Sequence, residues 1–238
     1  MILCIDSGNS RIKWGLHDGN AWVAQGAVAQ GGAADLVCQW RDWPVPHQAV
    51  LANVAGSPVE REIASVLAEL SVPLQIVQSS SNAGGVVNHY LEPSRLGVDR
   101  WCALIGAWAL FGKACVVVMA GTATTIDTLD AQGHFLGGRI LPGLDLMRRA
   151  LARDTAALPF AAGTYVDFPR RTEDAIASGC LDAQAGAIER IWHRCRAEKP
   201  LCVLSGGNAE LVGNQLVIPY RVAHNLPLEG LKRLASQS

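Results

Sequence analysis

A short polar stretch near the start of the chain has the residue types of a phosphate-binding loop. Residues 6–10, Asp-Ser-Gly-Asn-Ser, follow an apolar run, and Lys13 lies just beyond them. A glycine lets the backbone approach a ligand closely, small side chains leave N–H groups accessible to an anion, and a carboxylate can bind a metal ion. The same residue types also form ordinary β-turns. The stretch therefore predicts either a phosphate loop with a metal-binding aspartate or a simple hairpin turn.

Two further glycine turns resemble the first. Residues 117–123 repeat the pattern of residues 4–10: an apolar strand, a small residue, a glycine, a small polar residue and a second strand. A third turn, 205–208, follows an apolar strand and begins a helix, which is a favourable contact for an anion. Three such turns in two related halves are typical of the actin-like ATPase and sugar-kinase superfamily, whereas Walker A and dinucleotide fingerprints do not occur.

Two ionisable residues begin an otherwise apolar helix at 97–112. Asp99 could accept the proton of a substrate hydroxyl, or it could be a carboxylate stabilised by the helix dipole. Arg100 could bind a substrate carboxylate through charge-assisted hydrogen bonds, or it could form an ion pair with Asp99.

The composition limits the class of protein. The chain has 238 residues, 50% of them hydrophobic, and a formal net charge of -1, so nucleic acid and anionic membranes are not expected as partners. No apolar run approaches the ~20 residues that span a bilayer, and the start lacks the pattern of a signal peptide. The seven cysteines show no C-x-x-C spacing, which predicts reduced thiols in a cytoplasmic protein.

The hydrophobic pattern predicts an α/β protein with mixed sheets. We expect a helix over 57–70 capped by Ser57, a flexible loop over 79–86, and a long helix over 172–198 that is interrupted near Gly179. Strands are expected at 12–16, 49–55 and 73–77, three more within 114–143, and one at the start of 201–212. The expected domains are an N-terminal lobe, 1–112, and a C-terminal lobe, 113–238.

Four motifs in this order resemble the type III pantothenate kinase family: 6–14, 97–100, 120–127 and 137–143. Later stretches, 170–179 and 204–211, resemble the family as well, so the resemblance spans the chain. It implies ATP-dependent phosphorylation of pantothenate to 4'-phosphopantothenate, the first step towards coenzyme A. It also implies a homodimer in which each chain has two actin-like, ribonuclease H-like lobes with mixed sheets, flanking helices and an ATP cleft between them.

The resemblance also implies roles for individual residues. Asp99 is expected to be the general base. The carboxylate of Asp6 can hold Mg²⁺ directly or through water on chemical grounds, because Mg²⁺ prefers oxygen ligands and retains waters. The residues expected to bind ATP and its phosphates are Asp6, Ser7, Gly8, Asn9, Ser10, Arg11, Ile12, Lys13, Gly121 and Thr122. The residues expected to bind pantothenate are Tyr90, Gly97, Val98, Asp99, Arg100 and Thr172. For Lys13 an exposed strand lysine is the alternative interpretation.

One position departs from the family. Members usually have an aspartate two residues before the glycine that corresponds to Gly121, where it helps to hold K⁺ or ammonium. This chain has Met119 at that position. A thioether is a poor ligand for a hard cation, so dependence on a monovalent cation is in doubt. Asp127 is either a site residue or an outward-facing strand residue.

Two alternatives to a pantothenate kinase follow from the same motifs. Another actin-like small-molecule kinase would share the glycine turns, but the stretch 97–100 with Tyr90 upstream favours pantothenate. A non-catalytic regulatory protein could share the fold, but the near-neutral charge argues against DNA binding, and the presence of Asp6 and Asp99 argues against a catalytically inactive relative.

Overall fold

The chain folds into two compact units. The computed structural model describes residues 1–40, 43–196 and 199–236. The first unit comprises Met1–Gly112, Gly133–Phe135 and Asn225–Ser238, and the second comprises Lys113–Gln132 and Leu136–His224. The candidate residues are therefore distributed over two separate cores.

The first unit is built on a five-stranded mixed sheet in the order β3-β2-β1-β4-β5. Its strands are β1 (Ile2–Ser7), β2 (Arg11–His17), β3 (Trp22–Ala29), β4 (Gln48–Asn53) and β5 (Leu74–Ile76). The first three strands are antiparallel, and β4 and β5 run parallel to β1. Because β1 is central, the turn after it lies at an edge where the parallel strands β1 and β4 both end.

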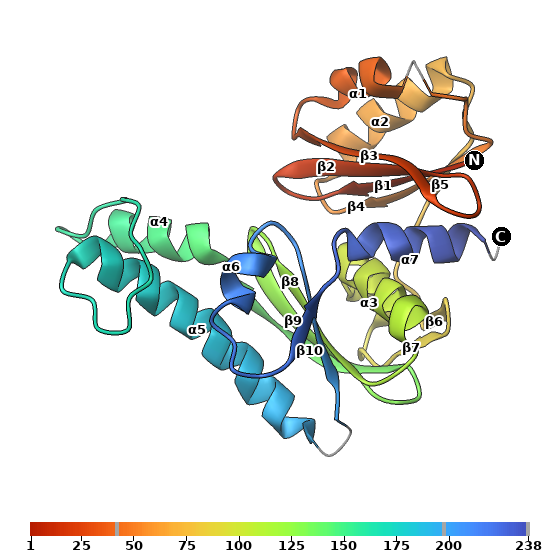
Figure 1. The fold of residues 1–238 in the computed structure, drawn as a ribbon. Coiled ribbons are helices and arrows are strands. Elements are labelled where there is room, and N and C mark those ends of the chain that lie inside the picture. The colour runs from red at the N-terminus through yellow and green to blue at the C-terminus, as the bar shows by residue number, and fades with distance from the viewer. Residues whose placement is uncertain (41–42, 197–198, 237–238) are drawn as a thin grey trace. The chain divides into compact units, whose positions relative to one another are not determined.

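Helices cover both faces of this sheet, as Figure 1 shows. The helices α1 (Ala33–Trp40) and α2 (Ser57–Glu69) pack on the face that carries Leu3 and Ile5. The helices α3 (Val98–Phe111) and α7 (Leu226–Ala235) lie on the opposite face, where α7 and Cys102 of α3 pack against Cys4. Alternate residues of β1 thus enter two different cores.

A small hairpin precedes α3. It consists of β6 (Asn82–Ala83) and β7 (Val86–Asn88), and the short 3₁₀ helix η1 (Pro93–Arg95) follows it. The strand β7 also pairs in parallel with His134 and Phe135, the first residues of β10 (His134–Pro142). The expected flexible loop over 79–86 is therefore wrong, because Gly84 and Gly85, both with positive φ, form a tight turn between paired strands.

The second unit repeats the strand order of the first. Its strands lie in the order β12-β11-β8-β9-β10, and they are β8 (Cys115–Ala120), β9 (Ala123–Leu129), β10, β11 (Leu201–Ser205) and β12 (Tyr220–Val222). As in the first unit, the first two strands are antiparallel and the last two run parallel to the central strand. This confirms the expected mixed sheets and the internal repeat.

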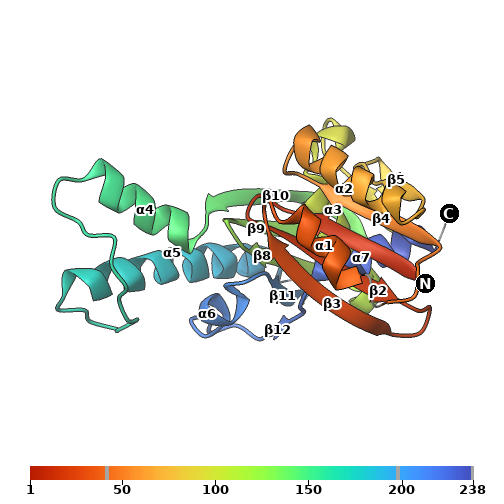
Figure 2. The same ribbon diagram turned by 90° about the horizontal axis from the view of Figure 1, so that it is seen from above.

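The described helices of the second unit include α4 (Leu144–Asp154), α5 (Thr172–Arg194) and α6 (Ala209–Gly213). The helix α5 packs on β8 and β9, and α4 lies beside its first half, as Figure 2 shows. The expected interruption of α5 near Gly179 is wrong: the helix is continuous, and a side chain at Gly179 would meet nothing within 4 Å.

Two other expectations need correction. Ser57 does not cap α2; it is the first helical residue, Gly56 is the N-cap, and no side chain caps this end. The C-terminal segment does not group with the second unit, since Asn225–Ser238 belong to the first. The reason is that α7 packs along α3, where Gly106 and Gly230 let the two backbones come close together.

Candidate functional site

The first candidate loop is the turn between β1 and β2. Asp6 and Ser7, at the end of β1, are buried, whereas Asn9 and Ser10 are exposed. The N–H of Gly8 donates to the carbonyl of Arg11 at 3.1 Å, which closes the turn. The loop therefore presents small polar residues to solvent beside a buried carboxylate.

Gln30, directly after β3, donates hydrogen bonds to two carbonyls of this loop. Its side-chain amide donates to the carbonyl of Gly8, and its backbone N–H donates to the carbonyl of Ser10 at 3.2 Å. Two carbonyls of the loop are thereby bound within the protein, which fixes the loop's shape. No motif identified Gln30, because its role depends on the pairing of β2 with β3.

Asp6 lies in an unusual electrostatic environment. Burial and the nearby charge of Asp99 raise the pKa of Asp6 from its ordinary value of 3.8 to about 7, although Lys13 acts in the opposite direction. Lys13 is the cross-strand partner of Asp6 on β2. The Oδ1 atom of Asp6 is buried and makes no hydrogen bond to the described residues. A buried carboxylate oxygen without a partner is costly unless a cation or a proton neutralises it.

The beginning of α3 positions Asp99. Gly97 is the N-cap, its carbonyl accepts the N–H of Trp101, and Asp99 lies in the first turn. The Oδ1 atom of Asp99 accepts the backbone N–H of Arg100 at 2.8 Å. A Cβ atom at Gly97 would lie only 2.7 Å from that Oδ1 atom, so the glycine makes room for the carboxylate. Asp99 is only partly buried, which leaves it able to meet a substrate.

Arg100 and Tyr90 lie together beside Asp99. Arg100 is 5% exposed, and its Nη1 atom donates to the hydroxyl of Tyr90 at 3.3 Å. The guanidinium also lies over the ring of Tyr90 and over that of Phe135. In the first unit, Asp6 thus interacts electrostatically with Lys13 and Asp99. Arg100 and Tyr90 are in direct contact.

The second unit brings the other two glycine turns together. The N–H of Gly121 donates to the carbonyl of Ala123 at 3.1 Å, repeating the turn at Gly8. Gly206, with φ 100°, packs against the backbone of Ala120, whose carbonyl accepts the N–H of Asn208 at 3.0 Å. The carbonyl of Thr122 accepts the N–H of Gly143 at 3.0 Å.

Three more candidates lie in the second unit. Thr172 is the first residue of α5 and is exposed. Asp127 on β9 is 1% exposed, so it is not a surface residue of its strand. Met119 on β8 is partly buried and pairs with Thr125 on β9 and Ser205 on β11. The Oγ1 atom of Thr125 is buried without a hydrogen-bond partner among the described residues.

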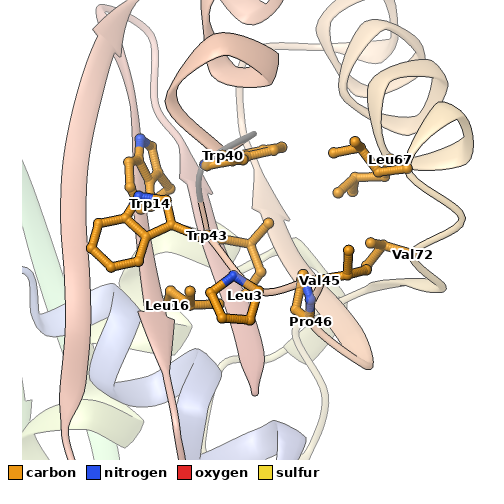
Figure 3. Close-up of a pocket in the computed structure, with 11 residues that line it drawn as sticks. Leu3, Trp14, Leu16, Trp40, Trp43, Val45, Pro46, Leu67 and Val72 are labelled. Atoms are coloured by element: carbon orange, nitrogen blue, oxygen red, sulfur yellow. The ribbon is translucent and has the colours of Figure 1, made fainter.

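A separate apolar pocket lies in the first unit, and Figure 3 shows the side chains around it. Trp14, Trp40 and Trp43 contribute aromatic surface, and the eleven described residues that line the pocket include no ionisable side chain. It opens on the face of the sheet with Leu3, opposite the face to which the strand alternation assigns Asp6. The pocket therefore supplies no acid, base or metal ligand.

The buried oxygen of Asp6 fits a Mg²⁺ ion. Within the described ranges, no group of three or more His, Cys, Asp and Glu side chains is arranged to hold a metal ion. Mg²⁺ is usually bound by one or two carboxylates together with water and substrate phosphates. The unpartnered oxygen of Asp6 matches that requirement.

Comparison with known proteins gives the family. The family model described as type III pantothenate kinase matches residues 2–194. A type III pantothenate kinase of Dechloromonas aromatica is 56% identical over 238 residues, covering 100% of both chains. One from Aromatoleum aromaticum is 50% identical, covering 100% of this chain and 98% of the relative.

Solved structures show the same fold at low identity. A Campylobacter jejuni protein described as a Baf-family transcriptional activator has a TM-score of 0.63 at 19% identity, covering 99% of this chain and 98% of that one. The ethanolamine utilization protein EutJ of Carboxydothermus hydrogenoformans has a TM-score of 0.55 at 16% identity, covering 98% of this chain and 88% of that one. These likenesses, together with the repeated sheets, show the actin-like fold. None of the helices in the described part of the chain is long and apolar enough to cross a membrane.

Proposed function

The chain belongs to the type III pantothenate kinase family, and from this premise we propose that it transfers the γ-phosphoryl group of ATP to the primary hydroxyl of pantothenate. The product is 4'-phosphopantothenate. The observation in the structure that supports this best is the buried, unpartnered oxygen of Asp6 within electrostatic range of Asp99. Phosphoryl transfer depends mainly on positioning and on neutralising charge. Asp99 can position the attacking hydroxyl, and Asp6 can hold the cation that neutralises the phosphate charge.

Each carboxylate has a distinct part in this proposal. Asp6 would hold Mg²⁺, directly or through water, and the ion would supply positive charge against the ATP phosphates. Asp99 is less buried and accepts the proton of the attacking hydroxyl. One of its oxygens is already bonded to the N–H of Arg100, which fixes the orientation of the carboxylate.

The remaining residues bind the two substrates. The turn at Gly8 and the turn at Gly121 and Thr122 are the proposed phosphate contacts. The N–H groups of Gly8 and Gly121 themselves close these turns, so neighbouring backbone N–H groups of each turn are the proposed donors to the phosphate oxygens. Arg100 binds the carboxylate of pantothenate, and Tyr90 lies beside it as a further contact. Thr172 is proposed as a pantothenate contact on the resemblance alone. Since the cysteines predict a reducing compartment, the cytoplasm is the proposed location.

The decisive experiment is a coupled ATP assay with pantothenate as acceptor. General-base catalysis contributes about 10²–10⁴-fold, so Asp99→Asn should lose turnover on that scale while its affinity for ATP stays close to wild type. A variant that lost ATP affinity and kept its turnover would contradict the role of Asp99.

The same assay separates the alternatives. A panel of sugars in place of pantothenate tests whether the chain is another small-molecule kinase of this fold. Wild-type protein that binds ATP and phosphorylates no acceptor would instead favour a regulatory protein.

A further inference from the structure

Two neighbouring aromatic rings lie beside the guanidinium of Arg100. Its Cζ atom lies 5.8 Å from the centroid of the Tyr90 ring and 5.9 Å from that of the Phe135 ring. The two rings are themselves 5.6 Å apart, with 31° between their planes. Arg100, Tyr90 and Phe135 therefore form one cluster, of which neither the motifs nor the proposed roles include Phe135.

The backbone of Phe135 is held firmly next to Tyr90. Phe135 is 0% exposed and pairs with Asn88 of β7 in a parallel register. Its carbonyl accepts the N–H of His89 at 3.2 Å. The ring of Phe135 is therefore placed by strand pairing and not by the helix that carries Arg100.

Asn88 connects this strand pair to Tyr90. Its Oδ1 atom accepts the N–H of Tyr90 at 3.0 Å, and its Nδ2 atom donates to the carbonyls of Ser80 at 3.1 Å and Pro93 at 3.2 Å. One buried amide thus joins the segments before and after Tyr90. The orientation of Tyr90 and that of Phe135 are set by the same two strands.

An arginine packed against two rings is restricted in how it can turn. The guanidinium is flat and presents its donors in one plane, so aromatic rings packed against it limit rotation and favour the charged form in a buried place. Binding a carboxylate through two parallel hydrogen bonds depends on the orientation of that plane. Removing one ring would leave the charge of Arg100 in place but allow its donors to turn.

We propose that Phe135 is a positioning residue that orients Arg100 and thereby selects substrates with a carboxylate. The inference rests on the proposed function, since it assumes that Arg100 binds the carboxylate of pantothenate. Phe135 touches Arg100 and Tyr90 rather than the reacting atoms. Its effect therefore belongs in the recognition of pantothenate and not in the transfer of the phosphoryl group.

The test compares pantothenate with pantothenyl alcohol, in which a hydroxymethyl group replaces the carboxylate. In Phe135→Leu we expect KM for pantothenate to rise about tenfold, because a guanidinium that can turn makes poorer charge-assisted hydrogen bonds to the carboxylate. The values of kcat and of KM for ATP should stay within about twofold of wild type. KM for the alcohol should change little, so the preference for the carboxylate falls by the same factor.

Two controls separate positioning from general damage to the fold. Phe111→Leu makes the same substitution at the far end of α3 and should leave the preference for pantothenate unchanged. In an Arg100→Lys background, Phe135→Leu should cause little further loss of the preference for pantothenate, because the lysine ammonium has no plane to orient. If Phe135→Leu does not fold, Phe135→Met fills more of the space and serves the same test.

Each outcome has a defined meaning. An equal loss with pantothenate and the alcohol, or a fall in kcat alone, would overturn the positioning role of Phe135. If the wild type is active and Phe135→Leu shows the same preference for pantothenate, the positioning role is also overturned, but the proposed function stands. A wild type that phosphorylates neither compound would contradict the proposed function itself, and this inference with it.

Discussion

At the scale of single residues, Asp6 lies in an unfavourable electrostatic environment. It is 8% exposed, one of its oxygens has no partner among the described residues, and its pKa is raised to about 7 mainly by burial. A carboxylate in such a place stabilises the metal-free protein poorly but is well prepared for a divalent cation.

We predict that Asp6→Asn keeps the fold and loses most of the kinase activity, and that raising Mg²⁺ restores little of it. The amide has nearly the shape of the carboxylate but is a neutral and weaker ligand for Mg²⁺. The measurement is initial rate against Mg²⁺ concentration, with thermal unfolding to verify the fold. Asp167→Asn, the same substitution at an exposed residue, serves as the control.

The raised pKa adds a pH dependence to this prediction. Below about pH 7 the metal-free carboxyl of Asp6 keeps its proton, which must leave before the metal binds. In the wild type, the Mg²⁺ concentration for half-maximal rate should therefore fall as pH rises from 6 to 8. Full activity of Asp6→Asn at ordinary Mg²⁺ would exclude the metal-binding role.

Met119 leads to a prediction about monovalent cations. A thioether removes both a carboxylate ligand and the charge that K⁺ would offset, so we expect activity to depend less on K⁺ or ammonium than is usual in the family. The rate should be measured in a Tris buffer free of both ions and then with KCl, against choline chloride. A Met119→Asp variant should gain dependence on the cation.

Strong, saturable activation by KCl alone would contradict this prediction and point to another oxygen ligand. The hydroxyl of Thr125 is the first candidate, because it is the cross-strand partner of Met119 and its oxygen is buried without a hydrogen-bond partner among the described residues. In that case Thr125→Val, which has the same shape without the oxygen, should abolish the activation.

At the scale of elements, the contact between α3 and α7 depends on two glycines. A Cβ atom at Gly106 would overlap the carbonyl of Leu226, and one at Gly230 would overlap the carbonyl of Cys102. The two helices pack more closely than side chains would allow, and α3 carries Asp99 and Arg100 at its first turn. This contact therefore supports the helix that holds the candidate base.

We predict that Gly230→Ala destabilises the protein by about 1–3 kcal/mol, as overpacking of a core does, although alanine favours a helix more than glycine. Gly186→Ala is the matched control, since Gly186 lies exposed in α5 and a Cβ atom there meets nothing within 4 Å. That variant should gain up to about 1 kcal/mol. Thermal unfolding of both variants gives the comparison, and equal changes in Tm would refute the close contact.

At the scale of the whole molecule, the expected homodimer needs an exposed apolar surface. The helices α3 and α5 offer little of it, because most of their apolar residues are buried within the chain. Exposed apolar side chains occur instead near α4 of the second unit. Leu146 is 40% exposed, and Phe160, which lies against Arg148 and Arg149, is 56% exposed.

We predict a homodimer that Phe160→Asp weakens, because burying a carboxylate in an apolar interface is unfavourable. Sedimentation at micromolar concentration gives the measurement. Val217→Asp is the control, since Val217 is also exposed but lies beyond α6, and it should leave the dimer intact. A wild-type monomer would contradict the dimer, and a dimer that resists Phe160→Asp would place the interface elsewhere.

The features that the sequence alone could predict are local ones. Turn chemistry placed the glycine loops after β1 and β8, and periodicity placed α3 between Gly97 and Gly112. The repeat of residues 4–10 at 117–123 predicted two related halves, and the order of motifs predicted the family. These features depend on residues that are neighbours in the chain, so their spacing is visible without a structure.

Only the tertiary structure reveals what surrounds those motifs. The desolvation of Asp6, the bonds from Gln30 to the loop at Gly8, and the ring of Phe135 against Arg100 all join residues far apart in the chain. The same is true of the C-terminal segment, which groups with the first unit because α7 packs along α3. Burial and strand pairing decide such contacts, and neither leaves a local pattern of residue types that could be recognised beforehand.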